Sequence, residues 1–253
     1  MKSSGKIFLC AICLCFLFSC ATPKAESPLA ANNSVSKIDK KARIAELNNS
    51  VFCISIVVKG TDRGKYSVGT AFLVEGNLLA SAFHVSIKAG QLAQEFRNKN
   101  YELIAWKTFQ NGDYIQFPIE LFVSDKNTDL ALYRFDRKIL TENPKYSVIK
   151  PLTLAENLPP VGEEVVSIGY YGDYEFPFNS IGTVAMIDKN EDIFSDLTIM
   201  PGNSGAPVCD LETGEVLGVT ISVLDLGNET VRFTIAKRAL KLRELLKRLE
   251  KKN

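Results

Sequence analysis

Apolar and β-branched residues occur in short runs along most of this 253-residue chain, and glycine, proline and asparagine recur between the runs. Runs of this length and composition predict β-strands, and turns that recur about every eight to twelve residues are typical of a sandwich or barrel. The predicted strands are residues 51–58, 66–74, 77–82, 101–107, 114–117, 119–123, 130–135, 164–170, 180–188, 194–200, 206–209, 216–223 and 230–235. The hydrophobic pattern therefore predicts an all-β fold.

Two segments change to the helical period. Apolar residues within 85–97 are spaced for one face of a helix, and so are the leucines within 237–253, which alternate there with lysine and arginine. A basic amphipathic helix of this kind either docks on the preceding domain or lies on an anionic membrane. We favour docking, because the segment directly follows the last predicted strand.

Proline-rich residues 141–160 divide the strand pattern into two parts. This stretch contains four prolines, which are not tolerated in central strands. We interpret it as a crossover between two β units, one at about 46–145 and the other at about 160–236.

The N-terminus has the pattern of an export signal. Lys2 and Lys6 precede an unbroken apolar run at residues 7–18, which is too short to span a bilayer comfortably. A membrane anchor or a buried helix is the less favoured alternative. The sequence LFSC at residues 17–20 resembles the lipobox of bacterial lipoproteins, which implies a signal peptide at 1–19 and lipidation, including palmitate, at Cys20. Residues 20–45, rich in small and polar side chains at their start, are expected to form a tether.

The charge balance excludes a strong electrostatic attraction to nucleic acid. The chain has 30 basic and 29 acidic residues, and loss of Lys2 and Lys6 with the signal would leave 28 against 29. Of the six cysteines, Cys53 and Cys209 lie in the predicted folded part. Export would permit a disulfide between them, and two separate buried thiols fit the apolar context equally well.

Three polar residues stand out within the strand pattern. His84 is the only histidine and follows the apolar run LLASAF, Asp129 precedes the apolar run LALY, and Ser204 lies within MPGNSGAPV. Each of them, taken alone, has an ordinary structural interpretation, such as a turn residue or a strand end. Together they contain the residue types of a serine nucleophile, its general base and the carboxylate that orients the base.

The order of these three residues along the chain limits the families to which the protein could belong. Ser-His-Asp triads occur in different chain orders on unrelated folds, and the order histidine, aspartate, serine is that of chymotrypsin-like enzymes. The sequence resembles trypsin-like serine peptidases of the bacterial HtrA/Deg-related branch, without a PDZ-like segment after the peptidase region. The stretches that carry this resemblance are GTAFLVEGNLLASAFHV, NTDLALYRF, VGEEVVSIGYYG, NSIGTVAMID and PGNSGAPV.

The resemblance implies a fold and a site. It implies a peptidase domain at 46–238 made of two six-stranded antiparallel β-barrels, with a cleft between them and a basic C-terminal helix at 237–253. It also implies that His84, Asp129 and Ser204 form a catalytic triad, with the backbone amides of Gly202 and Ser204 as the oxyanion hole. No cofactor or metal site is expected.

The resemblance further locates the pocket for the residue before the scissile bond. The residues expected to line it are Thr198, Ile199, Thr220, Ile221, Ser222 and Phe233. Because Thr198 is not acidic, we expect a small or medium apolar side chain to be accepted, rather than lysine or arginine. The expected partners are protein or peptide substrates and, through the lipid anchor, a membrane of the bacterial cell envelope.

Three functions remain open from the sequence. The first is an active, exported serine endopeptidase, and the second is an inactive protease-like lipoprotein that binds peptides or proteins. The third is an unrelated β-barrel surface protein whose motif matches are accidental.

Overall fold

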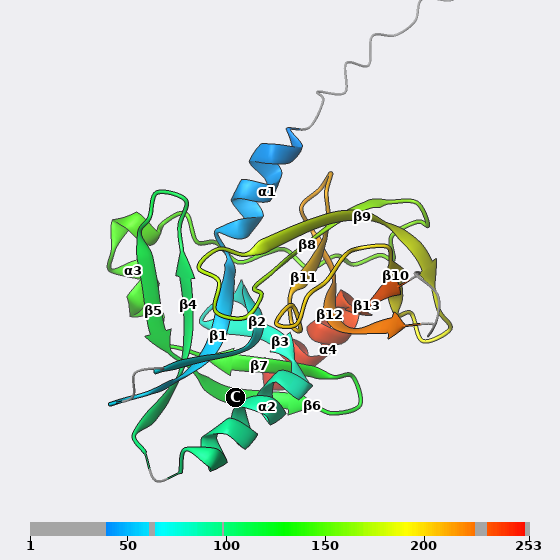
Figure 1. The fold of residues 1–253 in the computed structure, drawn as a ribbon. Coiled ribbons are helices and arrows are strands. Elements are labelled where there is room, and N and C mark those ends of the chain that lie inside the picture. The colour runs from blue at the N-terminus through cyan, green and yellow to red at the C-terminus, as the bar shows by residue number, and fades with distance from the viewer. Residues whose placement is uncertain (1–38, 61–63, 98, 226–231, 251–253) are drawn as a thin grey trace, which may run out of the picture. The chain divides into compact units, whose positions relative to one another are not determined.

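The computed structural model describes residues 39–60, 64–97, 99–225 and 232–250. Within these residues β-strands are the main regular secondary structure, and they are arranged as a first sheet and a closed barrel (Figure 1). The predicted signal peptide at 1–19, Cys20 and the first part of the predicted tether lie outside the described residues. The mainly β class predicted from the hydrophobic pattern is confirmed.

The first sheet contains seven strands in the order β5-β4-β1-β2-β3-β7-β6. These strands are β1 (Val51–Val58), β2 (Lys65–Glu75), β3 (Leu78–Ala82), β4 (Tyr101–Thr108), β5 (Tyr114–Pro118), β6 (Glu120–Asp125) and β7 (Leu130–Arg134). Strands β5 and β6 form the two edges, although only Ile119 separates them along the chain. The chain therefore bends at Ile119, whose buried side chain and N–H bond to Leu103 hold the bend. The hydrophobic pattern predicted these seven strands, whereas the family resemblance implied a barrel of six.

The second unit is a closed barrel in the order β10-β13-β12-β11-β8-β9. Its strands are β8 (Glu164–Gly169), β9 (Phe178–Ile187), β10 (Ile193–Ser195), β11 (Pro207–Asp210), β12 (Val216–Asp225) and β13 (Arg232–Arg238). The six strands agree with the expected second barrel. Between the two units, a short helix α3 (Lys138–Thr141) ends where the proline-rich crossover begins, and a 3₁₀ turn at Pro144–Tyr146 lies within the crossover.

Strand β10 is shorter than the predicted strand 194–200, because after Ser195 the backbone ladder continues only through a long bond from the Asp196 N–H to the Thr183 carbonyl at 3.3 Å, and side chains make the next hydrogen bonds. The Asp196 carboxylate accepts the N–H of Thr183 at 2.5 Å. The N–H of Thr198 donates to a serine hydroxyl at 2.9 Å, that of Ser180. The chain is thus fixed to its neighbours without continuing the strand.

Helix α1 (Lys40–Asn48) is a feature that the sequence analysis did not predict. Asp39 caps it, since its Oδ1 accepts the N–H groups of Lys41 at 3.0 Å and Ala42 at 3.2 Å. Residues 40–45 of the predicted tether are therefore helical.

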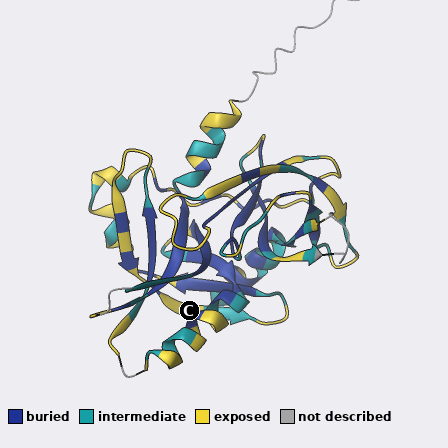
Figure 2. Cartoon of the chain, viewed as in Figure 1, coloured by how far each residue is buried: buried dark blue, intermediate teal, exposed yellow. Residues whose placement is uncertain are grey.

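The buried interior follows the strands of both units (Figure 2). One hydrophobic cluster contains residues from each: Trp106 of β4 and Tyr170, just after β8, lie with their ring centroids 5.3 Å apart. Leu242 of the C-terminal helix belongs to the same cluster. The first sheet, the barrel and this helix consequently share a core.

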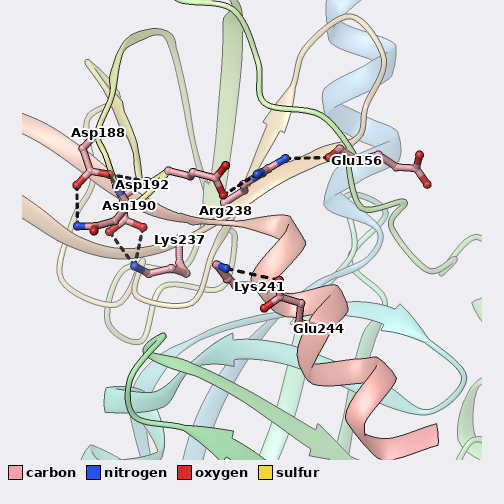
Figure 3. Close-up of polar contacts among 9 residues, drawn as sticks. Glu156, Asp188, Asn190, Asp192, Lys237, Arg238, Lys241 and Glu244 are labelled. Atoms are coloured by element: carbon pink, nitrogen blue, oxygen red, sulfur yellow. Dashed lines mark hydrogen bonds and ion pairs between the residues drawn. The ribbon is translucent and has the colours of Figure 1, made fainter. Parts of the chain in front are cut away.

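The C-terminal helix α4 (Ala239–Glu250) docks on the barrel, as favoured from the sequence. Its buried leucines are Leu242, Leu245 and Leu246. Just before the helix, Lys237 Nζ lies 2.5 Å from Asp192 Oδ1, and both side chains are largely buried (Figure 3). The next residue, Arg238, pairs with Glu191 at 2.6 Å. The apolar face is covered by protein, which argues against the alternative in which it lies on a membrane.

Cys53 of β1 and Cys209 of β11 are separate free thiols. Both are fully buried, and burial raises the pKa of both, that of Cys53 to about 11. Of the two alternatives left open by the sequence, the structure has two buried thiols.

Candidate active site

His84 and Asp129 are brought together by the pairing of β3 with β7. In this register Ala82 lies opposite Leu130, so the residues just beyond each strand become neighbours. The imidazole Nδ1 of His84 lies 2.8 Å from Asp129 Oδ2. The backbone N–H of His84 donates to Asp129 Oδ1 at 2.9 Å, and the N–H of Phe83 donates to the Asp129 carbonyl at 3.0 Å. Asp129 therefore fixes both the ring and the backbone of His84.

The same carboxylate caps a helix. Helix α2 (Phe83–Glu95) begins two residues earlier than predicted, and its N-cap residue Ala82 has no side chain that could accept a hydrogen bond. Asp129 supplies an acceptor for one N–H of the first turn and places negative charge there, where the helix dipole favours it. Asp129 itself has φ = +53°, a conformation that aspartate tolerates better than most residues. The start of α2 and the position of His84 thus depend on Asp129.

Ser204 lies on a tight turn before β11. The N–H of Asn203 donates to the Met200 carbonyl at 2.9 Å, with Pro201 and Gly202 between them and Gly202 at φ = +107°. Proline followed by a residue with positive φ is the signature of a type II turn. Asn203 is buried and its side chain accepts the N–H of Met200, which closes the turn a second time.

Backbone contacts place this turn against the element that carries His84. A Cβ on Gly205 would lie 2.2 Å from Ser81 Oγ and 3.0 Å from the N of Ala82. A Cβ on Gly69 would lie 2.6 Å from Val85 Cγ2 and 3.0 Å from the Ser204 carbonyl oxygen. The turn and the β3–α2 junction therefore approach so closely that only glycine fits at these positions.

Some of the polar groups of the Ser204 turn make hydrogen bonds, and others have no recorded partner among the described residues. In the part of the chain that the structure describes, no hydrogen bond joins the Ser204 hydroxyl to His84. Likewise, among the described residues no acceptor is recorded for the N–H groups of Gly202 and Ser204. By contrast, the N–H of Asn203 donates to the Met200 carbonyl, and the N–H of Gly205 donates to the Thr220 carbonyl.

The residues expected to line the specificity pocket are distributed between surface and core. Thr198 and Ser222 are exposed, whereas Thr220 is fully buried and its hydroxyl has no recorded partner within the described residues. Ile221 packs against the hydrophobic cluster of the first sheet, at an irregularity in the β12–β13 pairing.

The remaining two are partly buried. Ile199 follows Thr198 on the segment between β10 and β11, and Phe233 lies near the start of β13, opposite Leu224. The predicted pocket residues thus come from three segments of the second barrel, and the structure brings their backbones to the same barrel as Ser204.

Sequence reasoning missed Thr70. This residue of β2 is fully buried, and its hydroxyl donates to the Gly202 carbonyl at 2.7 Å and accepts the N–H of Tyr170 at 2.9 Å. A threonine within a strand is ordinary, because β-branched residues favour strands, so its type gave no signal. In the sequence this position differs from its neighbours only because a polar residue stands in the otherwise apolar stretch GTAFLV.

Two further properties bear on ligands. The described residues contain no group of three or more histidine, cysteine, aspartate or glutamate side chains that could hold a metal ion. Among them there is also no helix of the length and apolar character needed to cross a membrane.

The chain belongs to the family of trypsin-like peptidase domains. Residues 69–219, more than half of the chain, match that family. No curated protein sequence matches the chain. The chymotrypsin-like fold implied by the sequence motifs is therefore confirmed.

Solved structures of low sequence identity with a similar fold include a serine endoprotease and Deg5. A serine endoprotease from Yersinia pestis is 16% identical with a TM-score of 0.58, and the match covers 84% of this chain and 66% of that chain. Deg5 is 22% identical with a TM-score of 0.56, and the match covers 79% of this chain and 90% of that one. At these identities the likeness concerns the fold.

Proposed function

We propose that this protein is a serine endopeptidase that hydrolyses peptide bonds through Ser204, His84 and Asp129. The observation that carries the proposal is the double hydrogen bond from His84 to Asp129, next to a glycine-lined turn that bears Ser204. Family membership supports the same reaction class.

In the proposed reaction His84 acts first as a base. A serine hydroxyl is a weak nucleophile at neutral pH, so the imidazole must take its proton as the oxygen attacks the substrate carbonyl. Asp129, bonded to Nδ1, keeps the other nitrogen directed to Ser204 and stabilises the imidazolium. His84 then returns the proton to the leaving amine, and water hydrolyses the acyl-enzyme by the same steps in reverse.

This reaction requires a hydrogen bond between His84 Nε2 and Ser204 Oγ when substrate is bound. Catalytic hydrogen bonds are often long or poorly aligned without substrate and shorten in the reactive complex. The N–H groups of Gly202 and Ser204 would then bind the oxyanion of the tetrahedral intermediate. Such a donor is worth about 3–4 kcal/mol of barrier in serine peptidases.

The substrate preference and the location are part of the same proposal. We infer a small or medium apolar residue before the scissile bond, since Thr198 introduces no negative charge. Export, lipidation at Cys20 and a position on a membrane of the bacterial envelope are inferred from the N-terminal sequence. Incorporation of labelled palmitate that is lost in Cys20→Ser would support the anchor, and equal incorporation in both would contradict it.

A fluorophosphonate probe tests the proposed activity. It should label the wild-type protein and should not label folded Ser204→Ala, because the probe reacts with an activated serine. Absence of labelling in a folded wild-type sample would contradict the proposal and would support a peptide-binding role instead. Matched peptides that differ only before the scissile bond test the preference, and fastest cleavage after arginine would overturn it.

A further inference from the structure

Thr70 connects the first sheet to the turn that carries Ser204. Its hydroxyl donates to the carbonyl of Gly202 at 2.7 Å, and its backbone N–H donates to the carbonyl of Ser204 at 2.9 Å. The same hydroxyl accepts the N–H of Tyr170 at 2.9 Å. Both hydrogen-bonding functions of the hydroxyl are therefore used, within a fully buried site.

The bonds made by Thr70 act on the two peptide planes that flank the proposed oxyanion donors. The proposed donors are the N–H groups of Gly202 and Ser204. The carbonyl of each of these residues belongs to the next peptide plane along the chain. Gly202 has φ = +107° and carries no side chain that could hold it in this conformation. The N–H groups of the same two planes, on Asn203 and Gly205, donate to the carbonyls of Met200 and Thr220, so the carbonyl end of each plane is what remains to be held by a contact from outside the turn.

Thr70 can supply that contact because it is itself fixed. It lies in β2, where it pairs with Cys53 of the neighbouring strand. Its carbonyl accepts the hydroxyl of buried Ser81 at 2.6 Å. A Cβ on Gly205 would lie 2.2 Å from the same carbonyl oxygen, so the turn and β2 are packed without a gap.

Resting on the proposed function, we infer that the Thr70 hydroxyl is a positioning group for the oxyanion-binding turn. It holds the Gly202 carbonyl, and through it the orientation of the Gly202 and Ser204 amides. It acts through Gly202 and does not touch the substrate. Preorganised donors stabilise charge that develops only in the transition state, so the hydroxyl should influence turnover more than substrate binding.

The test compares wild type with Thr70→Ser and Thr70→Val in cleavage of a peptide anilide that has valine or alanine before the scissile bond. Serine keeps the hydroxyl, whereas valine keeps the shape but can neither donate to Gly202 nor accept from Tyr170. We expect Thr70→Val to lower kcat by about 10- to 100-fold with KM changed less than about threefold, since complete loss of one oxyanion donor costs about 100- to 1000-fold. Thr70→Ser should stay within about threefold of wild type.

Ser50→Ala is the matched control for lost buried hydrogen bonds. The hydroxyl of Ser50 is also buried and also bridges backbone groups, because it donates to the carbonyl of Lys150 and accepts the N–H of Lys150. Its loss should lower stability in the same way as Thr70→Val while kcat remains at the wild-type value. If Thr70→Val does not fold, Thr70→Cys takes its place, because a thiol of similar size is a weak donor.

The outcomes separate this inference from the proposed function. If wild type neither reacts with the fluorophosphonate nor cleaves the peptide, the proposed function fails. If wild type is active and folded Thr70→Val is equally active, the positioning role is overturned and the peptidase remains. A loss in Thr70→Ser as large as in Thr70→Val would also overturn it, since the hydroxyl would not then be the cause.

Discussion

The carboxylate of Asp129 accepts hydrogen bonds from both the imidazole and the backbone N–H of His84. Oδ2 lies 2.8 Å from Nδ1, and Oδ1 lies 2.9 Å from the backbone nitrogen. Both oxygens are therefore engaged by the same residue, one in the proposed chemistry and the other at the start of helix α2. The orientation of the proposed base is thereby tied to the folding of the helix that carries it.

Replacement of Asp129 by asparagine should separate these two roles. The asparagine oxygen can still accept the His84 N–H, but its amide would donate to Nδ1 and leave the proton on Nε2, which then cannot accept one from Ser204. We expect kcat to fall by about 10⁴-fold, with only about 1 kcal/mol lost from the free energy of unfolding. Peptide hydrolysis and urea unfolding measure the two effects.

Asp39→Asn is the control for this substitution. Asp39 is also a carboxylate that caps a helix start, that of α1, where it accepts two backbone N–H groups and no imidazole. It should show the change in stability without the change in turnover. Turnover of Asp129→Asn close to that of wild type would contradict the role proposed for Asp129.

Glycine at position 205 should be required for the turn that bears Ser204. An alanine there would place its Cβ 2.2 Å from both Ser81 Oγ and the Thr70 carbonyl oxygen, in a backbone with φ = +86°. Strain and overpacking together should cost about 2–5 kcal/mol and displace Ser204. The free energy of unfolding in urea and the rate of fluorophosphonate labelling should both decline in Gly205→Ala.

Gly162→Ala is the control that measures the cost of an unfavourable backbone conformation without the cost of overpacking. Gly162 has φ = +92°, but a Cβ at this position would have no atom within 4 Å apart from its own residue and its two chain neighbours, so an alanine there meets only the conformational penalty, about 1–2 kcal/mol. Its labelling rate should equal that of wild type. Equal losses of stability in the two variants would show that close packing at Gly205 is not important.

The strands could be predicted because their signal is local. Most predicted strands lie within two residues of the observed ones, since runs of buried β-branched residues such as Val51–Val58 have few alternative structures. Strand β10 was overestimated because the side chains of Asp196 and Ser180 replace the ladder there. Helix α1 was missed because its composition is polar and its stability comes from capping and docking.

The sequence supplies the residue types of the candidate site but not its geometry. His84, Asp129 and Ser204 were identified from rarity, motif and chain order, which are properties of the sequence. The contribution of Thr70 could not be found in this way, because its hydroxyl gains importance only when β2 meets the Gly202 turn of the other unit. Such contacts depend on tertiary packing between segments more than a hundred residues apart.

The two buried thiols should be inert in the folded protein. Burial raises the pKa of Cys53 to about 11 and that of Cys209 further, so thiolate is scarce at neutral pH. In a variant whose four N-terminal cysteines are serine, Ellman's reagent should report no thiol before unfolding and two afterwards. A single thiol or none after unfolding without reductant would indicate a modification or a disulfide instead.

Lys107 should make stability depend on pH near neutrality. The residue is 3% exposed, and its ammonium donates to the Asn48 carbonyl at the end of α1 and lies 4.8 Å from the centre of the Phe109 ring. No ion pair of Lys107 with a carboxylate is recorded in the described part of the chain. Burial therefore lowers its pKa from 10.5 to about 7.

The sign of the effect follows from proton binding. Between pH 7 and 10.5 the unfolded chain keeps the proton on Lys107 and the folded chain releases it, so the free energy of unfolding rises with pH. Below pH 7 both states are protonated, and the full cost of burying the charge is present. From pH 6.5 to 8.5 wild type should gain about 2 kcal/mol relative to Lys107→Met, in which this titration is absent.

Urea unfolding of both proteins at pH 6.5 and 8.5 measures this difference, because other titrating groups are common to the two and cancel in the comparison. Lys126→Met is the control, since Lys126 is exposed and its charge remains in water in both states. The difference between wild type and Lys126→Met should be the same at both pH values. A constant difference for Lys107→Met as well would mean that Lys107 keeps its proton in the folded protein, and that its contact with the Asn48 carbonyl compensates for burial of the charge.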